Sequence, residues 1–161
     1  MALTINQILH EKKQQILSRW QSSAFSCQNH DLLRGQKQEQ RFSNPIAYVI
    51  EKNTREIYEW LIKDEKDGDL FTPLEEICRF KAVQDIKPAE ALHFIFALKQ
   101  IIRDELKDQS HSSDGKAQLW DVDQRIDEVA LLAFNIFSDY RARIYELRIA
   151  EIKRMYGRDA G

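Results

Sequence analysis

Residues 116–156 read KAQLWDVDQRIDEVALLAFNIFSDYRARIYELRIAEIKRMY and contain no proline or glycine. Apolar side chains recur there in steps of three and four residues, which places them on one face of a helix. The members of this stripe are Leu119, Val122, Ile126, Val129, Ala133, Ile136 and Tyr140. A straight helix of this length measures about 60 Å, whereas a compact chain of this size is roughly 40 Å across. The last turns are therefore predicted to leave the body of the protein.

A second copy of the chain is the predicted contact of these last turns. An apolar helix face that leaves its own body gains stability by packing against another apolar surface. The sequence therefore predicts a homodimer whose interface includes Ile136, Tyr140, Ile144 and Leu147.

Two helices are predicted before residue 70. Thr4 and Gln7 form a capping-box pattern, which starts a helix over residues 4–22. Residues 23–42 are polar and rich in glutamine, and they are predicted to be a loop. Asn44-Pro45 then combines a capping residue with a proline suited to the first helical position, so a second helix is predicted to end near Lys63.

Two more helices are predicted before the long one. Thr72-Pro73 repeats the capping pattern and starts a helix that ends near Asp85. Lys87-Pro88 starts a strongly apolar helix, typical of the centre of a core. The loop at residues 109–115 follows, and no segment alternates with the period of a strand. The fold class is therefore all-α, a bundle of four or five major helices in one domain over residues 1–161.

Composition excludes several classes of protein. Lys and Arg total 24 against 26 Asp and Glu, so the basic excess of a nucleic-acid binder is lacking. No apolar run is long enough to span a membrane, and the first residues lack a signal-peptide core. Cys27 and Cys78 lack the spacing of a CxxC pair and are predicted to be reduced thiols. These features predict a cytoplasmic protein.

The sequence carries no catalytic or metal-binding signature. The four histidines, His10, His30, His93 and His111, are scattered without a zinc-site spacing. No glycine-rich phosphate loop and no GxSxG pattern is found. Asp127 lies near Arg125, and we interpret it as half of a structural ion pair. We therefore predict a protein that is not an enzyme and has no cofactor or metal.

A series of short motifs extends over nearly the whole chain. They are Arg19-Trp20, the run from Arg41 to Tyr48, the run from Arg79 to Asp85, Pro88, Ala91, Phe94-Ile95-Phe96, Leu98-Lys99, Arg125-Ile126-Asp127, Ala133-Phe134, Arg141, Tyr145 and Arg148. In these motifs, their order and their spacing, the chain resembles the N-terminal domain of the bacterial RsbR/RsbRD-type co-antagonists that build the stressosome.

This resemblance implies a globin-like fold without haem, a dimer, and a long last helix that leads into a STAS output domain. The sequence ends at Gly161 and contains no STAS domain. Two interpretations stay open: a stand-alone module, or a piece of a longer protein. The resemblance supplies no ligand and no catalytic residue.

The leading functional hypothesis is a dimeric sensor or regulatory domain that relays a signal from a small molecule or a protein partner through its last helix. A haem- or cofactor-binding globin-like sensor or redox protein, using His93, is the alternative. Nucleic-acid binding is a weaker third hypothesis. Three candidate ligand- or partner-binding residues lie where the second, third and fourth helices are predicted to meet: Arg79, Gln84 and Lys99. His93 is a fourth candidate and is predicted to face outward or to line a subunit contact. Structural ion pairs and caps are the competing explanation for each of them.

Overall fold

The fold was analysed in a computed structural model that describes residues 3–26, 45–65, 67–109 and 111–159. These residues form six α-helices and no strand, which confirms the all-α prediction with a long last helix. The predicted cap Asn44 and residues 27–42 of the predicted loop lie outside the described residues, whereas residues 23–26 belong to a helix, so the predicted loop begins too early. The helices are α1 (Ile5–Glu11), α2 (Lys13–Ser26), α4 (Pro45–Ile62), α5 (Phe71–Ala82), α6 (Pro88–Glu105) and α7 (Ser113–Asp159).

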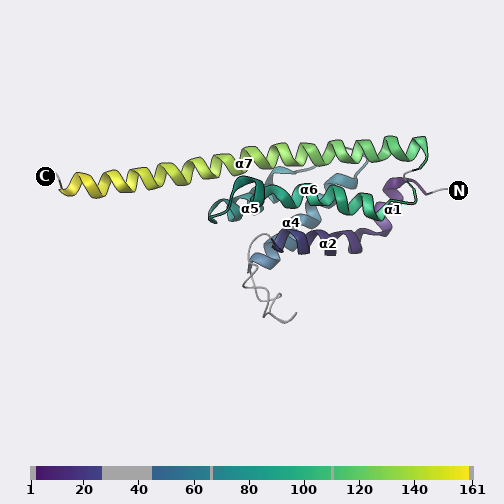
Figure 1. The fold of residues 1–161 in the computed structure, drawn as a ribbon, viewed down its shortest axis with the longest axis horizontal. Helices are drawn as coiled ribbons and strands as arrows, with labels where there is room; N and C mark the ends of the chain where they lie inside the picture. Colours follow the sequence, from purple (N-terminus) through teal and green to yellow (C-terminus); the bar gives the residue numbers. More distant parts are fainter. Residues whose placement is uncertain (1–2, 27–44, 66, 110, 160–161) are drawn as a thin grey trace.

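The body consists of three layers of helices. Helices α5 and α6 lie between α7 on one side and the pair α2 and α4 on the other. Figure 1 shows α7 running along the whole body and continuing alone to the C-terminal end. At about 1.5 Å per residue, its 47 residues measure about 70 Å. The prediction that the last turns leave the body is therefore met.

The first predicted helix is divided into α1 and α2 at Lys12, so its predicted continuity is wrong. Its capping box is present: Thr4 Oγ1 accepts from the Gln7 N–H, and Gln7 Oε1 accepts from the Thr4 N–H. At the bend, the buried Tyr58 hydroxyl donates to the Leu9 carbonyl oxygen at 2.9 Å. A side chain that bonds a carbonyl of the ladder is a common cause of a kink, and only the tertiary fold supplies it.

Helix α5 begins at Phe71, one residue before the predicted cap at Thr72. The Asp69 carboxylate accepts from the Thr72 N–H at 3.1 Å, and hydrogen bonds from Thr72 lower the pKa of Asp69. The N-cap position is therefore Leu70 and not the predicted Thr72, and the Asp69 carboxylate just before it accepts a hydrogen bond from the first turn. The helix also ends earlier than predicted, at Ala82 instead of near Asp85.

Helix α7 begins at Ser113, so the predicted loop over residues 109–115 is too long. The Ser112 hydroxyl accepts from the Gly115 N–H at 3.0 Å and caps the first turn. Gly115 is buried, and a Cβ atom there would lie 2.5 Å from the Gln109 carbonyl oxygen. Glycine is thus required by the close approach of the preceding loop.

Replacement of Gly115 by alanine is expected to lower the free energy of unfolding by about 1–3 kcal/mol, because the new methyl group meets rigid backbone. Gly157→Ala is the matched control, since nothing lies within 4 Å of a Cβ atom there. Urea unfolding of both variants makes the comparison. A Gly115→Ala protein as stable as the Gly157→Ala protein would contradict the packing argument.

The core is continuous from α1 to the middle of α7. The apolar face of α6 predicted for the core is buried, and the Trp20 indole N–H donates to the Phe94 carbonyl oxygen at 2.8 Å. The Trp20 and Phe94 rings stack with centroids 6.1 Å apart. No helix among the described residues is both long and apolar enough to cross a membrane.

Candidate functional site

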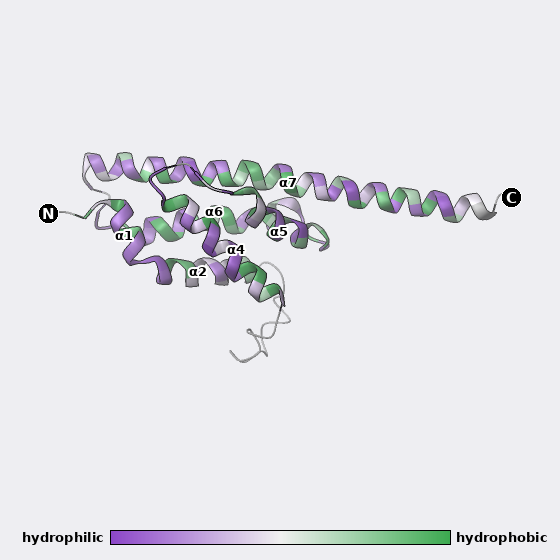
Figure 2. Cartoon of the chain, turned by 180° about the vertical axis from the view of Figure 1, so that it is seen from behind, coloured by the Kyte–Doolittle hydropathy of each residue, from purple (hydrophilic) through white to green (hydrophobic). Residues whose placement is uncertain are grey.

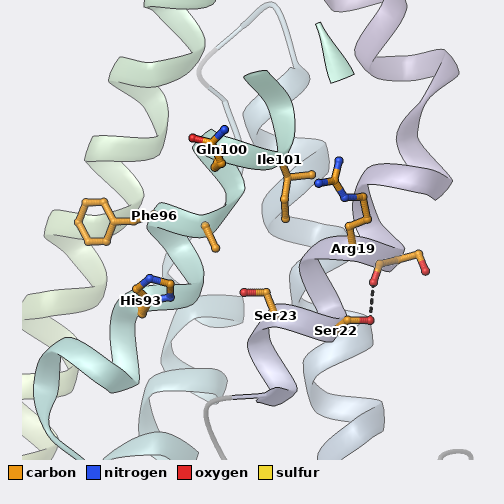
Figure 3. A pocket seen from close by; sticks show the side chains of 9 residues that line it. Arg19, Ser22, Ser23, His93, Phe96, Gln100 and Ile101 are labelled. Carbon is orange, nitrogen blue, oxygen red and sulfur yellow. Dashed lines mark hydrogen bonds between the residues drawn. The ribbon is translucent and has the colours of Figure 1, made fainter. Parts of the chain in front are cut away.

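A surface groove of about 680 Å³ runs between the outer sides of α2 and α6. Figure 3 shows Arg19, Ser22 and Ser23 on α2 beside His93 and Gln100 on the neighbouring α6. The complete lining is Ser18, Arg19, Ser22, Ser23, His93, Phe96, Ala97, Gln100 and Ile101.

Small side chains open this groove. Ser18 and Ser22 are four residues apart and therefore share one face of α2, and they line the groove together with Ala97 of α6. The Ser22 hydroxyl donates to the Ser18 carbonyl oxygen at 3.0 Å, so it bonds its own helix and does not cross the gap. The spacing of these serines was a signal in the sequence, but their facing partner on α6 was not evident.

A network of charges closes one end of the groove. The Arg19 guanidinium donates to Glu105 Oε1 at 2.9 Å and to Asp104 Oδ2 at 3.3 Å, and these hydrogen bonds raise its pKa. Lys12 donates to Glu105 Oε2 at 3.2 Å and to the Glu105 carbonyl oxygen at 2.9 Å. The network ties the bend between α1 and α2 to the end of α6.

The carboxyl groups of this network are stabilised in their charged form. Burial of Glu105 raises its pKa, but hydrogen bonds from Lys12 and Arg19 outweigh burial, and the net shift is downward. Hydrogen bonds from Gln100 and Arg19 lower the pKa of Asp104. The unfolded chain therefore binds more protons, so the free energy of unfolding rises with pH. This contribution is complete above the unfolded pKa values of about 4 and is lost as the pH falls below them.

Glu105→Gln is expected to lower the free energy of unfolding at neutral pH by about 1–3 kcal/mol, because it weakens charged hydrogen bonds at a carboxylate that is only 9% exposed. It should also flatten the loss of stability between about pH 5 and pH 3. Urea unfolding across this range measures both effects. Glu59→Gln is the control, since the Lys13–Glu59 pair is more exposed and should contribute little. Parallel pH profiles for Glu105→Gln and the parent would contradict the assignment.

The chemistry of the groove favours a neutral, hydrogen-bonding ligand with one apolar side. Hydroxyl, imidazole and amide groups are at hand, while Ala97 and Ile101 supply an apolar floor. Arg19 is already paired with two carboxylates, so an anionic ligand would compete with Glu105 and Asp104 for it. No group of three or more metal-ligating side chains was found in the part of the chain that the structure describes.

The four predicted ligand-binding residues do not converge. His93 is exposed at the edge of the groove, and Gln84 lines a separate cavity of about 80 Å³ beside α7. Lys99 donates to Asp127 of α7 at 2.6 Å, so the partner of Asp127 is Lys99 and not the predicted Arg125. Arg79 is exposed on α5. Arg19 and Ser22, which line the groove, were not among the predicted residues.

Arg125 instead caps the end of α4. Its guanidinium donates to the carbonyl oxygens of Leu61, Lys63 and Asp64. A second hollow of about 600 Å³ lies beside it, with mostly polar walls that include His10 and Asp64. Because Arg125 is occupied by backbone carbonyls, we assign it a structural role.

The predicted dimer residues divide between the core and the surface. Ile136 is 4% exposed and lies in the core of its own chain, and Tyr140 and Ile144 pack against that core. The Tyr140 hydroxyl donates to Glu75 Oε1 at 2.7 Å. Leu147, at 71% exposed, is open to a partner. The face that carries the first three residues is therefore used within the protomer.

A second apolar stripe lies on the opposite side of α7. We call it the outer stripe; its members are all at least half exposed and lie within about 60° of one another around the helix. The outer stripe consists of Trp120, Leu131, Phe134, Tyr145, Ile149, Ile152 and Tyr156. In Figure 2 hydrophobic bands recur along α7 on the body and on its free part. The outer stripe was not identified from the sequence, because the stripe from Leu119 to Tyr140 already explained why the helix has an apolar face.

Helix α6 widens the outer stripe on the body. The Lys99–Asp127 and Arg103–Asp123 ion pairs show that α6 and α7 run antiparallel. Phe96 lies one turn before Lys99, and Leu131 lies one turn after Asp127, so the two are level with each other. Phe96 is 51% exposed and points away from α2 in Figure 3. Phe96, Leu131 and Phe134 thus form an apolar patch on the body, and Tyr145, Ile149, Ile152 and Tyr156 form a second patch on the free part of α7.

Comparison with known proteins gives one family. Residues 30–152 match the family model described as the RsbT co-antagonist protein rsbRD N-terminal domain. The match includes α4, α5, α6 and most of α7. Comparisons with curated proteins and with solved structures give no match.

Proposed function

The chain belongs to the family of RsbT co-antagonist rsbRD N-terminal domains, a stressosome-associated regulatory family, and from this membership we propose that it is a non-enzymatic, dimeric signalling module. In this proposal the body receives the signal, and α7 relays it to a partner protein. The family relationship suggests a partner in a stressosome-type complex in the cytoplasm. A globin-like fold of the helical body is part of the same proposal.

The outer stripe is the observation that carries the dimer. Monomeric proteins rarely expose a contiguous apolar surface of more than a few hundred Å². Aromatic and large aliphatic side chains that are at least half exposed each leave on the order of 100 Å² open to solvent. Seven of them and Phe96, on each of two chains, supply on the order of 1,600 Å², the area of a standard stable interface.

The spacing of the outer stripe fits a helical partner. Tyr145, Ile149, Ile152 and Tyr156 follow one another by four, three and four residues on the free part of α7. This spacing is typical of the seam of a coiled coil, in which each side chain packs between residues of the facing helix. A second α7 offers the same spacing. We therefore propose that α7 pairs with its copy along the outer stripe.

Light scattering over a concentration series tests the dimer. We expect a mass of twice one chain at micromolar concentrations, falling towards one chain on dilution. A mass of one chain at every concentration would contradict the proposed dimer.

The alternative hypothesis of a haem sensor is tested by absorbance spectroscopy of protein that was expressed with haem supplied. A Soret band would favour this hypothesis, and His93→Ala should then abolish the band.

The groove between α2 and α6 is the proposed small-molecule site of the sensor. Thermal-shift screening against neutral, hydrogen-bonding metabolites should identify stabilising compounds. In Ser22→Phe the ring fills the groove, so stabilisation should be lost, while Arg79→Ala should retain it because Arg79 does not line the groove. If Arg79→Ala loses the stabilisation and Ser22→Phe retains it, the compound binds at α5 and not in the groove. If no compound stabilises the parent, the groove is not a ligand site.

A further inference from the structure

A single arginine joins α7 to the corner between α5 and α6, just before the free part of α7, which begins at Tyr145. The Arg141 Nη2 donates to the backbone carbonyl oxygens of Gln84 and Ile86, each at 2.7 Å. Its guanidinium carbon lies 4.9 Å from the centre of the Phe137 ring, one turn earlier on α7. Arg141 therefore bridges two parts of the chain that are more than fifty residues apart.

This bridge stands where α7 leaves the body. Among the residues that the structure describes, Arg141 is the last one of α7 whose side chain hydrogen-bonds to the body. Ile144 makes the last apolar contact with the core, and from Tyr145 onwards the described side chains are exposed. Arg141 and Ile144 thus make the last contacts of α7 with the body before its free part begins at Tyr145.

Only some of the hydrogen-bond donors of the Arg141 guanidinium have partners. The Arg141 Nε atom is buried and has no hydrogen-bond partner among the described residues. Its acceptors are neutral carbonyls instead of carboxylates, and the cavity of about 80 Å³ that Arg141 lines shows that packing beside it is incomplete. A buried polar contact that is incompletely paired is easier to break than a complete network. The corner is also accessible, since Val83 is 64% exposed.

We propose that the pairing of Arg141 with the Gln84 and Ile86 carbonyls is a conformational latch that sets the direction of the free part of α7. This inference rests on the proposed function, in which α7 is the relay. A ligand or partner that moves the corner would separate the carbonyls from Nη2 and release the helix.

The geometry amplifies such a movement. Arg141 lies about 6 Å along the helix axis from Phe137, while Asp159 lies about 33 Å from it. If Phe137 in the core is the pivot, a shift of about 1 Å at Arg141 moves the far end by about 5 Å. A displacement of this size at a helix end is large enough to be measured between two spin labels.

Double electron–electron resonance tests the latch. One label is placed on α4 by Glu56→Cys and the other on the free helix by Lys153→Cys, since both positions are exposed. Cys27 is changed to serine. Cys78 is buried, which raises its pKa to about 12, so it stays unlabelled. Labelled chains are mixed with excess unlabelled chains so that distances within one chain are measured.

The parent should give one narrow distance distribution. Arg141→Ala should broaden it or shift it by several Å, and Arg141→Lys should fall between the two because it retains a donor. Arg143→Ala is the matched control, since Arg143 is exposed and lies over the Tyr140 ring without contacting the corner.

An unchanged distribution in Arg141→Ala would overturn the latch, even if its melting temperature falls, because the contact would then be purely structural. Equal broadening in Arg141→Ala and Arg143→Ala would also overturn it. Sedimentation of the same samples separates the two ideas: a monomer would contradict the proposed dimer, while the distances within one chain would still decide the latch.

Discussion

Ile149→Glu combined with Ile152→Glu is expected to convert the proposed dimer into a folded monomer. Both residues belong to the outer stripe and are about half exposed in the single chain, so the fold does not depend on them. In a dimer they would be buried, and two unpaired carboxylates would be desolvated at the interface. A cost of at least about 3 kcal/mol raises the dissociation constant at least about 100-fold. Sedimentation equilibrium measures this change.

Two exposed positions on the same part of α7 serve as comparisons. Ala150→Glu adds the same charge on the flank of the outer stripe and should leave the dimer nearly intact. Leu147→Glu tests the face that the sequence predicted for the interface. Dissociation by Leu147→Glu, with Ile149→Glu combined with Ile152→Glu still dimeric, would show that the partner binds the opposite face.

Trp20→Ala is expected to lower the free energy of unfolding by about 3–5 kcal/mol. Trp20 is 0% exposed, and its removal leaves a cavity against Phe94 and deletes the hydrogen bond to the Phe94 carbonyl oxygen. This is a large fraction of the roughly 5–15 kcal/mol by which a domain is stable. Urea unfolding should be done in the monomeric background of Ile149→Glu and Ile152→Glu, so that dissociation of a dimer does not contribute to the measured free energy of unfolding.

Two variants divide this effect into its parts. Trp20→Phe keeps an aromatic ring beside Phe94 but removes the donor, so it should cost only about 1–2 kcal/mol. Trp120→Ala removes a tryptophan that is 64% exposed and should change stability by no more than about 0.5 kcal/mol in the monomeric background. Equal losses for Trp20→Ala and Trp120→Ala would contradict the observed burial.

Local signals predicted most helix starts within a few residues. Pro45 and Pro88 open α4 and α6 as predicted, because a proline restricts the backbone wherever the rest of the fold lies. Errors arose where a distant side chain decides the boundary. Tyr58 bonds the Leu9 carbonyl at the bend between α1 and α2, and the close approach of Gln109 to Gly115 places the start of α7.

The candidate sites were less predictable than the helices. His93 lies in the groove, but Arg79, Gln84 and Lys99 lie elsewhere, because residues on one helix face different neighbours according to how the helices pack. Lys99 forms an ion pair with Asp127. A structural ion pair was the competing explanation to ligand binding for this residue. The hydrogen bond from Arg141 to a corner more than fifty residues away has no local signature in the sequence.

The sequence by itself determined that the chain is helical and that its last helix is longer than the body. Periodicity, capping residues and the absence of proline and glycine act within a few residues, so they can be read without coordinates. Only the tertiary structure decided which of the two apolar faces of α7 is covered, where the groove opens and what Arg141 holds. Those outcomes depend on burial between distant segments, and a helix with apolar residues on two sides does not show by itself which side its own core will take.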